Sequence, residues 1–164
     1  MRIGKCLQTV ALTAGMGLML GGAAMATNLG VSANISNTCS IGTVTALAFG
    51  AYDPIAANAA ADLHTQGSIA LTCTLGDAAA TVGLGLGGQP LSTQRYMSDG
   101  TDTLAYNIYS TADFATVWDD SANKVTAPTG TGLPQTLTVY GSIPQAQNKP
   151  AGSYSDAVVI DVTP

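Results

Sequence analysis

Residues 27–36 read TNLGVSANIS, and their alternation of apolar and polar side chains is the clearest structural signal in the sequence. The odd positions hold Leu29, Val31, Ala33 and Ile35, whereas the positions between them are glycine or polar. Because successive side chains of a β-strand point to opposite faces, the pattern predicts a strand with one apolar face. Pairing within the domain and insertion into a neighbouring molecule need the same alternation, so both remain open.

Further strand-like segments follow, separated by stretches rich in Gly, Pro, Asp and Thr. The two stretches 91–102 and 123–134 are expected to be connections, and no convincing helix is expected after residue 26. Such a series of short strands predicts an all-β, antiparallel β-sandwich. The expected strands are 39–49, 67–75, 80–87, 104–110, 136–143 and 154–162, with a short additional one at 114–118.

The last expected strand carries Val158, Ile160 and Val162 on its inward face. The sequence stops shortly afterwards at Pro164, so we expect no further strand to cover this edge. An uncovered edge leaves backbone groups unpaired, and each buried polar group without a partner costs about 1–3 kcal/mol. These residues are therefore expected to border an acceptor groove that favours an incoming strand.

Residues 1–26 have the three-part pattern of a secretory signal peptide. Arg2 and Lys5 give a basic start, an apolar stretch spans 10–20, and small residues precede an expected cleavage after Ala26. The apolar stretch is too short to cross about 30 Å of hydrocarbon, which disfavours a membrane anchor. Export of the mature chain is therefore predicted, and the family resemblance described below implies a route through the periplasm to the cell surface.

Removal of the signal leaves 138 residues, a length suited to one domain, with three basic residues, ten aspartates and no glutamate. The formal net charge is then −7. Nucleic acids and anionic membranes both bind basic surfaces, so neither is expected as a partner. We also expect no membrane insertion of the mature chain.

Two cysteines remain in the mature chain, Cys39 and Cys73, because Cys6 lies in the signal. In an exported protein such a pair predicts a disulfide. The bond would close a loop of about 35 residues and contribute roughly 3–4 kcal/mol in the chain-entropy model. A metal-binding or catalytic thiol lacks partners, since there is no CxxC motif and His64 is the only histidine.

No constellation of residues indicates catalysis, and no cofactor is expected. His64 lies in a polar stretch without a GxSxG nucleophile elbow elsewhere, so a surface histidine is the better interpretation. Asp119 and Asp120 lack the DxDxDG spacing of a calcium loop and indicate a solvated turn. The glycines of 83–88 fit neither a dinucleotide nor a P-loop motif. The chain is predicted not to be an enzyme.

Several stretches, in order, resemble the spore coat protein U domain family, which includes pilins of the archaic chaperone–usher pathway. The alternating segment that runs into Cys39 is the first of them. The others are Phe49–Asp53 (FGAYD), Gly67–Cys73 (GSIALTC), Arg95–Met97 (RYM), Leu104–Tyr109 (LAYNIY), Val139–Pro144 (VYGSIP) and Ala151–Asp156 (AGSYSD).

The resemblance implies an incomplete immunoglobulin-like sandwich that lacks its final strand. A periplasmic chaperone would lend a strand, an outer-membrane usher would export the subunit, and the N-terminal segment of a neighbouring subunit would then fill the groove. Residues 27–37 would be the donor segment, with Leu29, Val31, Ala33 and Ile35 inserted, and residues 38–164 would form the body.

The sequence thus favours a structural subunit of a surface pilus that polymerises by donor-strand exchange and serves adhesion or biofilm formation. A coat protein of spores or cells is the first alternative. A secreted carbohydrate-binding β-sandwich and, last, a small secreted hydrolase are the others.

Overall fold

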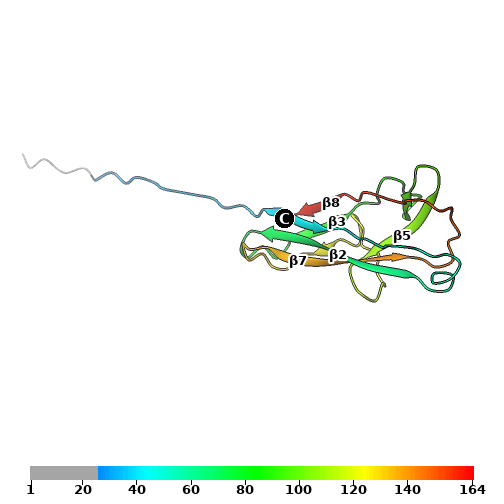
Figure 1. Ribbon diagram of the computed structural model, residues 1–164. Coiled ribbons are helices and arrows are strands. Elements are labelled where there is room, and N and C mark those ends of the chain that lie inside the picture. The colour runs from blue at the N-terminus through cyan, green and yellow to red at the C-terminus, as the bar shows by residue number, and fades with distance from the viewer. Residues whose placement is uncertain (1–25) are drawn as a thin grey trace, which may run out of the picture. The chain divides into compact units, whose positions relative to one another are not determined.

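The computed structural model describes residues 26–164, which fall into two units divided between Asn34 and Ile35. The signal peptide expected at 1–26 lies, apart from Ala26, outside the described residues. The unit 35–164 contains eight strands, labelled in Figure 1 where space allows. They are β1 (Cys39–Thr45), β2 (Leu63–Cys73), β3 (Thr81–Leu84), β4 (Arg95–Ser98), β5 (Thr103–Tyr109), β6 (Val125–Thr126), β7 (Gln135–Ile143) and β8 (Ile160–Thr163).

The strands of this unit form two antiparallel sheets. One sheet has five strands in the order β1-β2-β7-β5-β4, and the other has three in the order β6-β3-β8. Residues 26–164 contain no helix. The predicted all-β antiparallel sandwich is therefore confirmed. β1 and β8 are edge strands of different sheets, and Figure 1 shows β8, in red, beside the start of β1.

The core lies between the sheets, where the alternating residues predicted to face inward are buried. On β5, Leu104, Tyr106 and Ile108 are 4–5% exposed, while their neighbours on the strand are half-buried. Trp118 is 1% exposed and donates its indole N–H to the carbonyl of Val82 at 2.8 Å. The tryptophan is therefore a core residue with its polar group satisfied.

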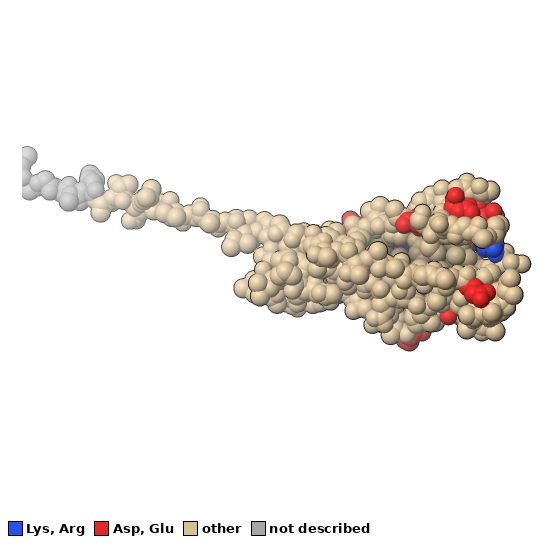
Figure 2. All heavy atoms as spheres, in the orientation of Figure 1, with Lys and Arg blue, Asp and Glu red and all other residues tan. Residues whose placement is uncertain are grey.

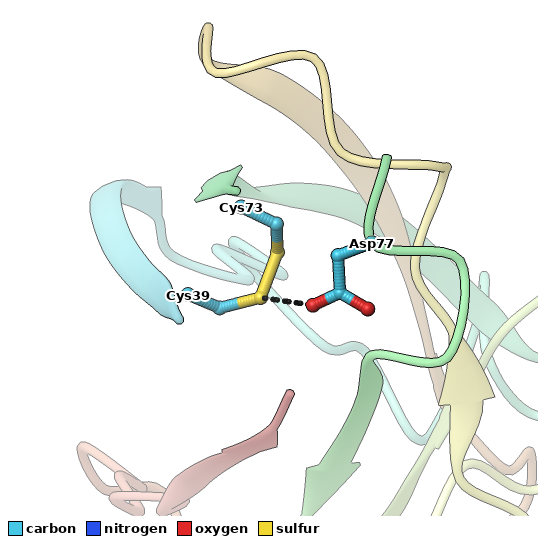
Figure 3. Close-up of side chains that lie close together, drawn as sticks. All are labelled: Cys39, Cys73 and Asp77. Atoms are coloured by element: carbon cyan, nitrogen blue, oxygen red, sulfur yellow. Dashed lines mark hydrogen bonds between the residues drawn. A yellow bond between two sulfur atoms is a disulfide. The ribbon is translucent and has the colours of Figure 1, made fainter. Parts of the chain in front are cut away.

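The disulfide between Cys39 and Cys73 is present, as predicted, and it joins directly opposed residues of β1 and β2. The carboxylate of Asp77, which is 2% exposed, lies 3.8 Å from Cys39 Sγ (Figure 3). Asp77 also accepts the backbone N–H of Ala79 at 3.1 Å, which shapes the turn that follows β2. The disulfide thus lies at one end of the sandwich and fixes the first strand to the sheet.

Four segments differ from the sequence prediction. Of the expected last strand 154–162, only the part from Ile160 belongs to a strand, β8. β4 lies within the stretch 91–102 expected to be a connection, and β6 lies within the expected loop 123–134. The expected strand at 114–118 is instead a loop, with one isolated bridge between Val117 and Tyr109. Very short strands leave too few positions for an alternating pattern, which explains why the sequence signal is weak there.

The segment before β1 also lacks strand structure in the described residues. Residues 26–38 have no strand assignment, and Leu29, Val31 and Ile35 are 90%, 89% and 84% exposed. A row of exposed apolar side chains is unusual for a soluble chain without a binding partner.

Candidate strand-acceptor groove

An apolar groove of about 370 Å³ lies on the side of the unit 35–164 where the edge strands β1 and β8 face each other. One wall is formed by 44–49, which includes the end of β1 and the residues after it. The other wall is formed by 154–160, which leads into β8. The floor comes from β2, β3, β4, β5 and β7 and consists of Ile69, Leu84, Met97, Tyr106, Ile108 and Val139.

The groove continues into a second hollow of about 820 Å³. The two hollows share Leu47, Phe49, Met97 and Tyr154, so they form one channel along the open side of the sandwich. The second hollow is lined by residues from 47–55 and 147–154 together with Leu104 and Ile143. A channel bordered by strand edges is suited to an extended peptide, which can pair with those edges.

Two glycines of the sheet allow the first wall to pack closely against it. A Cβ atom at Gly67 would lie 2.5 Å from the carbonyl oxygen of Thr45, and one at Gly141 would lie 2.7 Å from Phe49 Cζ. Only glycine permits such close approach without a shift of the neighbouring atoms. Gly67 and Gly141 therefore allow the segment 45–49 to lie against β2 and β7 with Leu47 and Phe49 packed on the core.

The second wall is fixed by hydrogen bonds to Asp156. Its carboxylate accepts the hydroxyl of Tyr106 at 2.6 Å and the backbone N–H of Gly88 at 2.7 Å. Next to it, Ser155 and Ser98 exchange two backbone hydrogen bonds of 2.9 and 3.0 Å. These contacts hold the chain before β8 in place, so the groove is preformed between two fixed walls.

Tyr106 connects the floor to this wall and is sensitive to alkaline pH. Burial, and then the hydrogen bond to Asp156, raise the pKa of Tyr106 well above its usual range. The folded state therefore keeps a proton that the unfolded chain loses above about pH 10. The contribution of Tyr106 to the free energy of unfolding should therefore be constant with pH below about pH 10 and should decrease as the pH rises above it.

Urea unfolding of the wild type and of Tyr106→Phe at pH 8 and pH 11 measures this contribution. The wild type should lose more stability between the two pH values than Tyr106→Phe, which has no phenol to ionise. Tyr109→Phe is the matched control, because Tyr109 is a half-buried tyrosine on the same strand. Equal alkaline losses in wild type and Tyr106→Phe would contradict the assignment.

The structure places the predicted acceptor residues at this groove only in part. Val158 and Ile160 line it, whereas Val162 packs against the core and is not among the groove-lining residues. The strand β8 starts at Ile160, so Val158 precedes it. Sequence reasoning did not identify the opposite wall, although the alternation of Leu47 and Phe49 with alanines indicated an inward-facing segment there.

Two titratable residues that the sequence singled out, His64 and Asp119, make structural contacts. His64 is exposed and stacks on Phe114 with ring centroids 3.9 Å apart. Asp119 accepts the backbone N–H groups of Ser121 and Asn123, both at 2.8 Å, and so forms a turn. These hydrogen bonds, led by that from Asn123, lower the pKa of Asp119. Asp119 thus lies in a turn, as predicted, whereas His64 is exposed but belongs to β2 and not to an isolated loop position.

The metal-ligating side chains that lie close together in the described part of the chain are Cys39, Cys73 and Asp77 (Figure 3). Both sulfur atoms belong to the disulfide, so neither is a thiolate and the group does not form a metal site.

The face in Figure 2 shows scattered acidic residues and few basic ones on a largely uncharged surface. Among residues 26–164 there is no helix of the length and hydrophobicity needed to cross a membrane.

Comparisons with known proteins agree with the fold. The family model of the Spore Coat Protein U domain matches residues 25–161. Protein U of Myxococcus xanthus is 37% identical over 149 residues, which cover 83% of this chain and 83% of that protein. A chain in the crystal structure of the CsuC–CsuE chaperone–tip adhesion subunit pre-assembly complex, from archaic chaperone–usher Csu pili of Acinetobacter baumannii, is similar with a TM-score of 0.57. At 22% identity this second likeness concerns the fold alone, and the match spans 78% of this chain and 40% of that one.

Proposed function

Because the chain belongs to the Spore Coat Protein U domain family, we propose that it is a structural subunit of a surface pilus that polymerises by donor-strand exchange. The observation that carries the proposal is the groove between the unpaired edges of β1 and β8. The neighbouring subunit supplies the missing strand, and the resulting fibre serves adhesion or biofilm formation. No catalytic role is part of this function.

The two groove walls are suited to accept a strand between them. β1 pairs with β2 on one side, and β8 pairs with β3 on one side, so each has a second edge available. The N–H and C=O groups of a free edge are a template for another strand. An inserted strand would bond to both edges and cover Ile69, Ile108 and Val139 on the floor, which joins the two sheets into a closed sandwich.

The segment 27–37 has the properties of the donor, and 38–164 is the body that receives it. Leu29, Val31, Ala33 and Ile35 lie on one face of an extended chain, and the three larger side chains are 84–90% exposed. Seven residues from Leu29 to Ile35 span roughly 20–24 Å as a strand. Each of the larger side chains gains about 1.5–3 kcal/mol on burial, so insertion into an apolar groove is strongly favoured.

Before assembly the same groove needs protection, and we assign this task to a periplasmic chaperone that lends a strand. The structural relative comes from a complex named as chaperone and tip adhesion subunit, which supports a partner of this kind. An outer-membrane usher then exports the subunit, whose signal peptide at 1–26 directs it to the periplasm. The sparse charge of the face seen in Figure 2 suits a subunit that packs into a fibre.

Deletion of 27–36 tests the function. The shortened subunit should form a stable complex with its chaperone but no SDS-resistant ladder, because no strand is available for the next groove. The measurement is electrophoresis of unheated samples after removal of the chaperone. A ladder as strong as that of the wild type would contradict donor-strand exchange.

Two neighbouring substitutions provide a matched control. Val31→Asp places a charge on the inserted face and should abolish the ladder, since burial of an unpaired carboxylate is costly. Ser32→Asp places the same charge on the opposite face and should leave most of the ladder intact. The contrast separates insertion of this face from a general effect of added charge.

A coat protein of spores or cells is the second candidate, favoured by the 37% identity to Protein U over most of both chains. It would use the same groove and donor segment in a layer instead of a fibre. Labelled antibodies in electron microscopy of the producing cells distinguish the two: filaments that extend from the surface support the pilus, and a continuous layer supports the coat.

A further inference from the structure

The root of the donor segment is bonded to Thr74, the residue that follows β2. Thr38 donates its backbone N–H to Thr74 Oγ1 at 3.0 Å, and its carbonyl accepts the backbone N–H of Thr74 at 2.9 Å. The Thr74 hydroxyl also lies 3.2 Å from Thr38 Oγ1, and two carbonyls are within reach of its proton, that of Thr38 at 3.2 Å and that of Ser36 at 3.5 Å. One side chain thus contacts two residues of the root, Ser36 and Thr38, which lie on either side of Asn37.

These bonds continue the pairing of β1 with β2 beyond the disulfide. Cys39 is opposite Cys73 in the ladder, and Thr38 is opposite Thr74 by the bonds described above. The backbone at Ser36–Thr38 therefore runs in the direction of β1 and does not reverse. A chain that turned back at these residues would lose the bond from Thr38 N to the Thr74 hydroxyl.

A reversal at this point would bring the donor segment into the groove of its own subunit. Leu29–Ile35 and β1 each contain seven residues, so the segment is long enough to run back along β1. The residues 36–38 would then be a three-residue hairpin loop, which is a common length. Ile35 would then lie opposite Cys39 and Leu29 opposite Thr45, so the segment would cover the free edge of β1 and reach the groove lining at its far end. The effective concentration of a tethered segment reaches the millimolar range.

We propose that Thr74 is a specificity-determining residue for assembly, because its hydroxyl holds Ser36 and Thr38 in line with β1 and disfavours insertion of the donor segment into its own groove. The segment is thereby left for a neighbouring copy of the chain. This inference rests on the proposed function, since it concerns which groove the donor fills.

Thr74→Val tests the proposal because it keeps the shape of the side chain and removes the hydroxyl. The processed full chain is purified with its chaperone, the chaperone is removed, and the fractions in the SDS-resistant ladder and in the monomer are measured. Loss of these hydrogen bonds should raise the ratio of monomer to ladder roughly threefold to tenfold. Thr74→Ser retains the hydroxyl and should restore the wild-type ratio.

Thr72→Val is the matched control on β2, since the carbonyl of Thr72, and not its hydroxyl, accepts the hydrogen bond from Ser40. Thr74→Ala also removes the hydroxyl but leaves a smaller side chain than Thr74→Val. If the hydroxyl is responsible, both variants should raise the ratio of monomer to ladder by the same factor. Hydrogen exchange on the monomer fraction gives the second measurement: amides of 27–36 should exchange slowly in Thr74→Val, because the segment pairs in its own groove.

The outcomes are distinct. A wild-type ratio in both Thr74→Val and Thr74→Ala would overturn the proposal, and so would additional monomer in which 27–36 exchanges rapidly. Absence of a ladder from the wild type itself would instead refute the proposed function, on which the role of Thr74 depends.

Discussion

Replacement of Arg95 by methionine is expected to lower the free energy of unfolding by about 3–5 kcal/mol, because three buried carbonyls lose their donor and each buried group left unpaired costs about 1–3 kcal/mol. Arg95 is 0% exposed and donates to three carbonyls, those of Leu84, Gly85 and Trp118, at 2.7–2.8 Å. Without the guanidinium, these acceptors stay buried and lose their donors. Urea unfolding at neutral pH, with the disulfide intact, measures the change.

Arg95→Lys should also destabilise the protein, by less, because an ammonium group cannot reproduce the fork of donors. The control is Lys124→Met, which removes a surface ion pair with Asp161 at 3.0 Å and should change stability by less than about 1 kcal/mol. If Arg95→Met were as mild as Lys124→Met, the guanidinium would not hold the loops before β4 and after β5 together.

The second large effect is expected from loss of the disulfide. Replacement of both Cys39 and Cys73 by alanine should lower the free energy of unfolding by about 2–5 kcal/mol and reduce the yield of exported protein. The bond spans 34 residues of sequence, and Cys73 is 3% exposed, so the change removes both a cross-link and buried contacts. Urea unfolding and the amount of periplasmic protein are the measurements.

The alanine pair also has a matched control. Reduction of the wild type under native conditions should give the same destabilisation without a change of side-chain volume. Titration with a thiol reagent reports the state of the cysteines, and two free thiols in mature, exported protein would show that the bond is not formed in the cell.

The class of fold was predictable from the sequence because the longer strands have enough residues to show the alternation of apolar and polar side chains. The residues of β2, β5 and β7 that alternate in the sequence are those that alternate in burial, as with Leu104, Tyr106 and Ile108. β4 was missed because its buried position is Arg95, a residue that the pattern counts as exposed. A buried charge is recognisable only once its carbonyl partners are brought near by the fold.

The groove was only partly predictable, for a related reason. A sequence indicates which face of a strand is apolar, so Val158 and Ile160 could be expected at an open edge. It does not indicate which other strand lies across that edge, because β1 and β8 are far apart in the chain. The wall at 44–49, the glycines that seat it and the bond between Tyr106 and Asp156 all depend on this long-range placement.

The relation between donor segment and groove can be examined in a single chain. In the variant without 27–36, the sequence TNLGVSANISN is added after Pro164 through a short Gly-Asn loop, so that it can return along β8 as a hairpin. An otherwise identical chain with aspartate at the position of Val31 in the added sequence is the control. Both are purified without chaperone.

We expect the first chain to be a monomer without an SDS-resistant ladder, with a free energy of unfolding at least about 3 kcal/mol above that of the aspartate control. Hydrogen exchange should slow along 44–49 and 158–163 as the two edges become paired. Equal stability of the two chains, with exchange at both edges unchanged, would contradict the account that this groove accepts this strand.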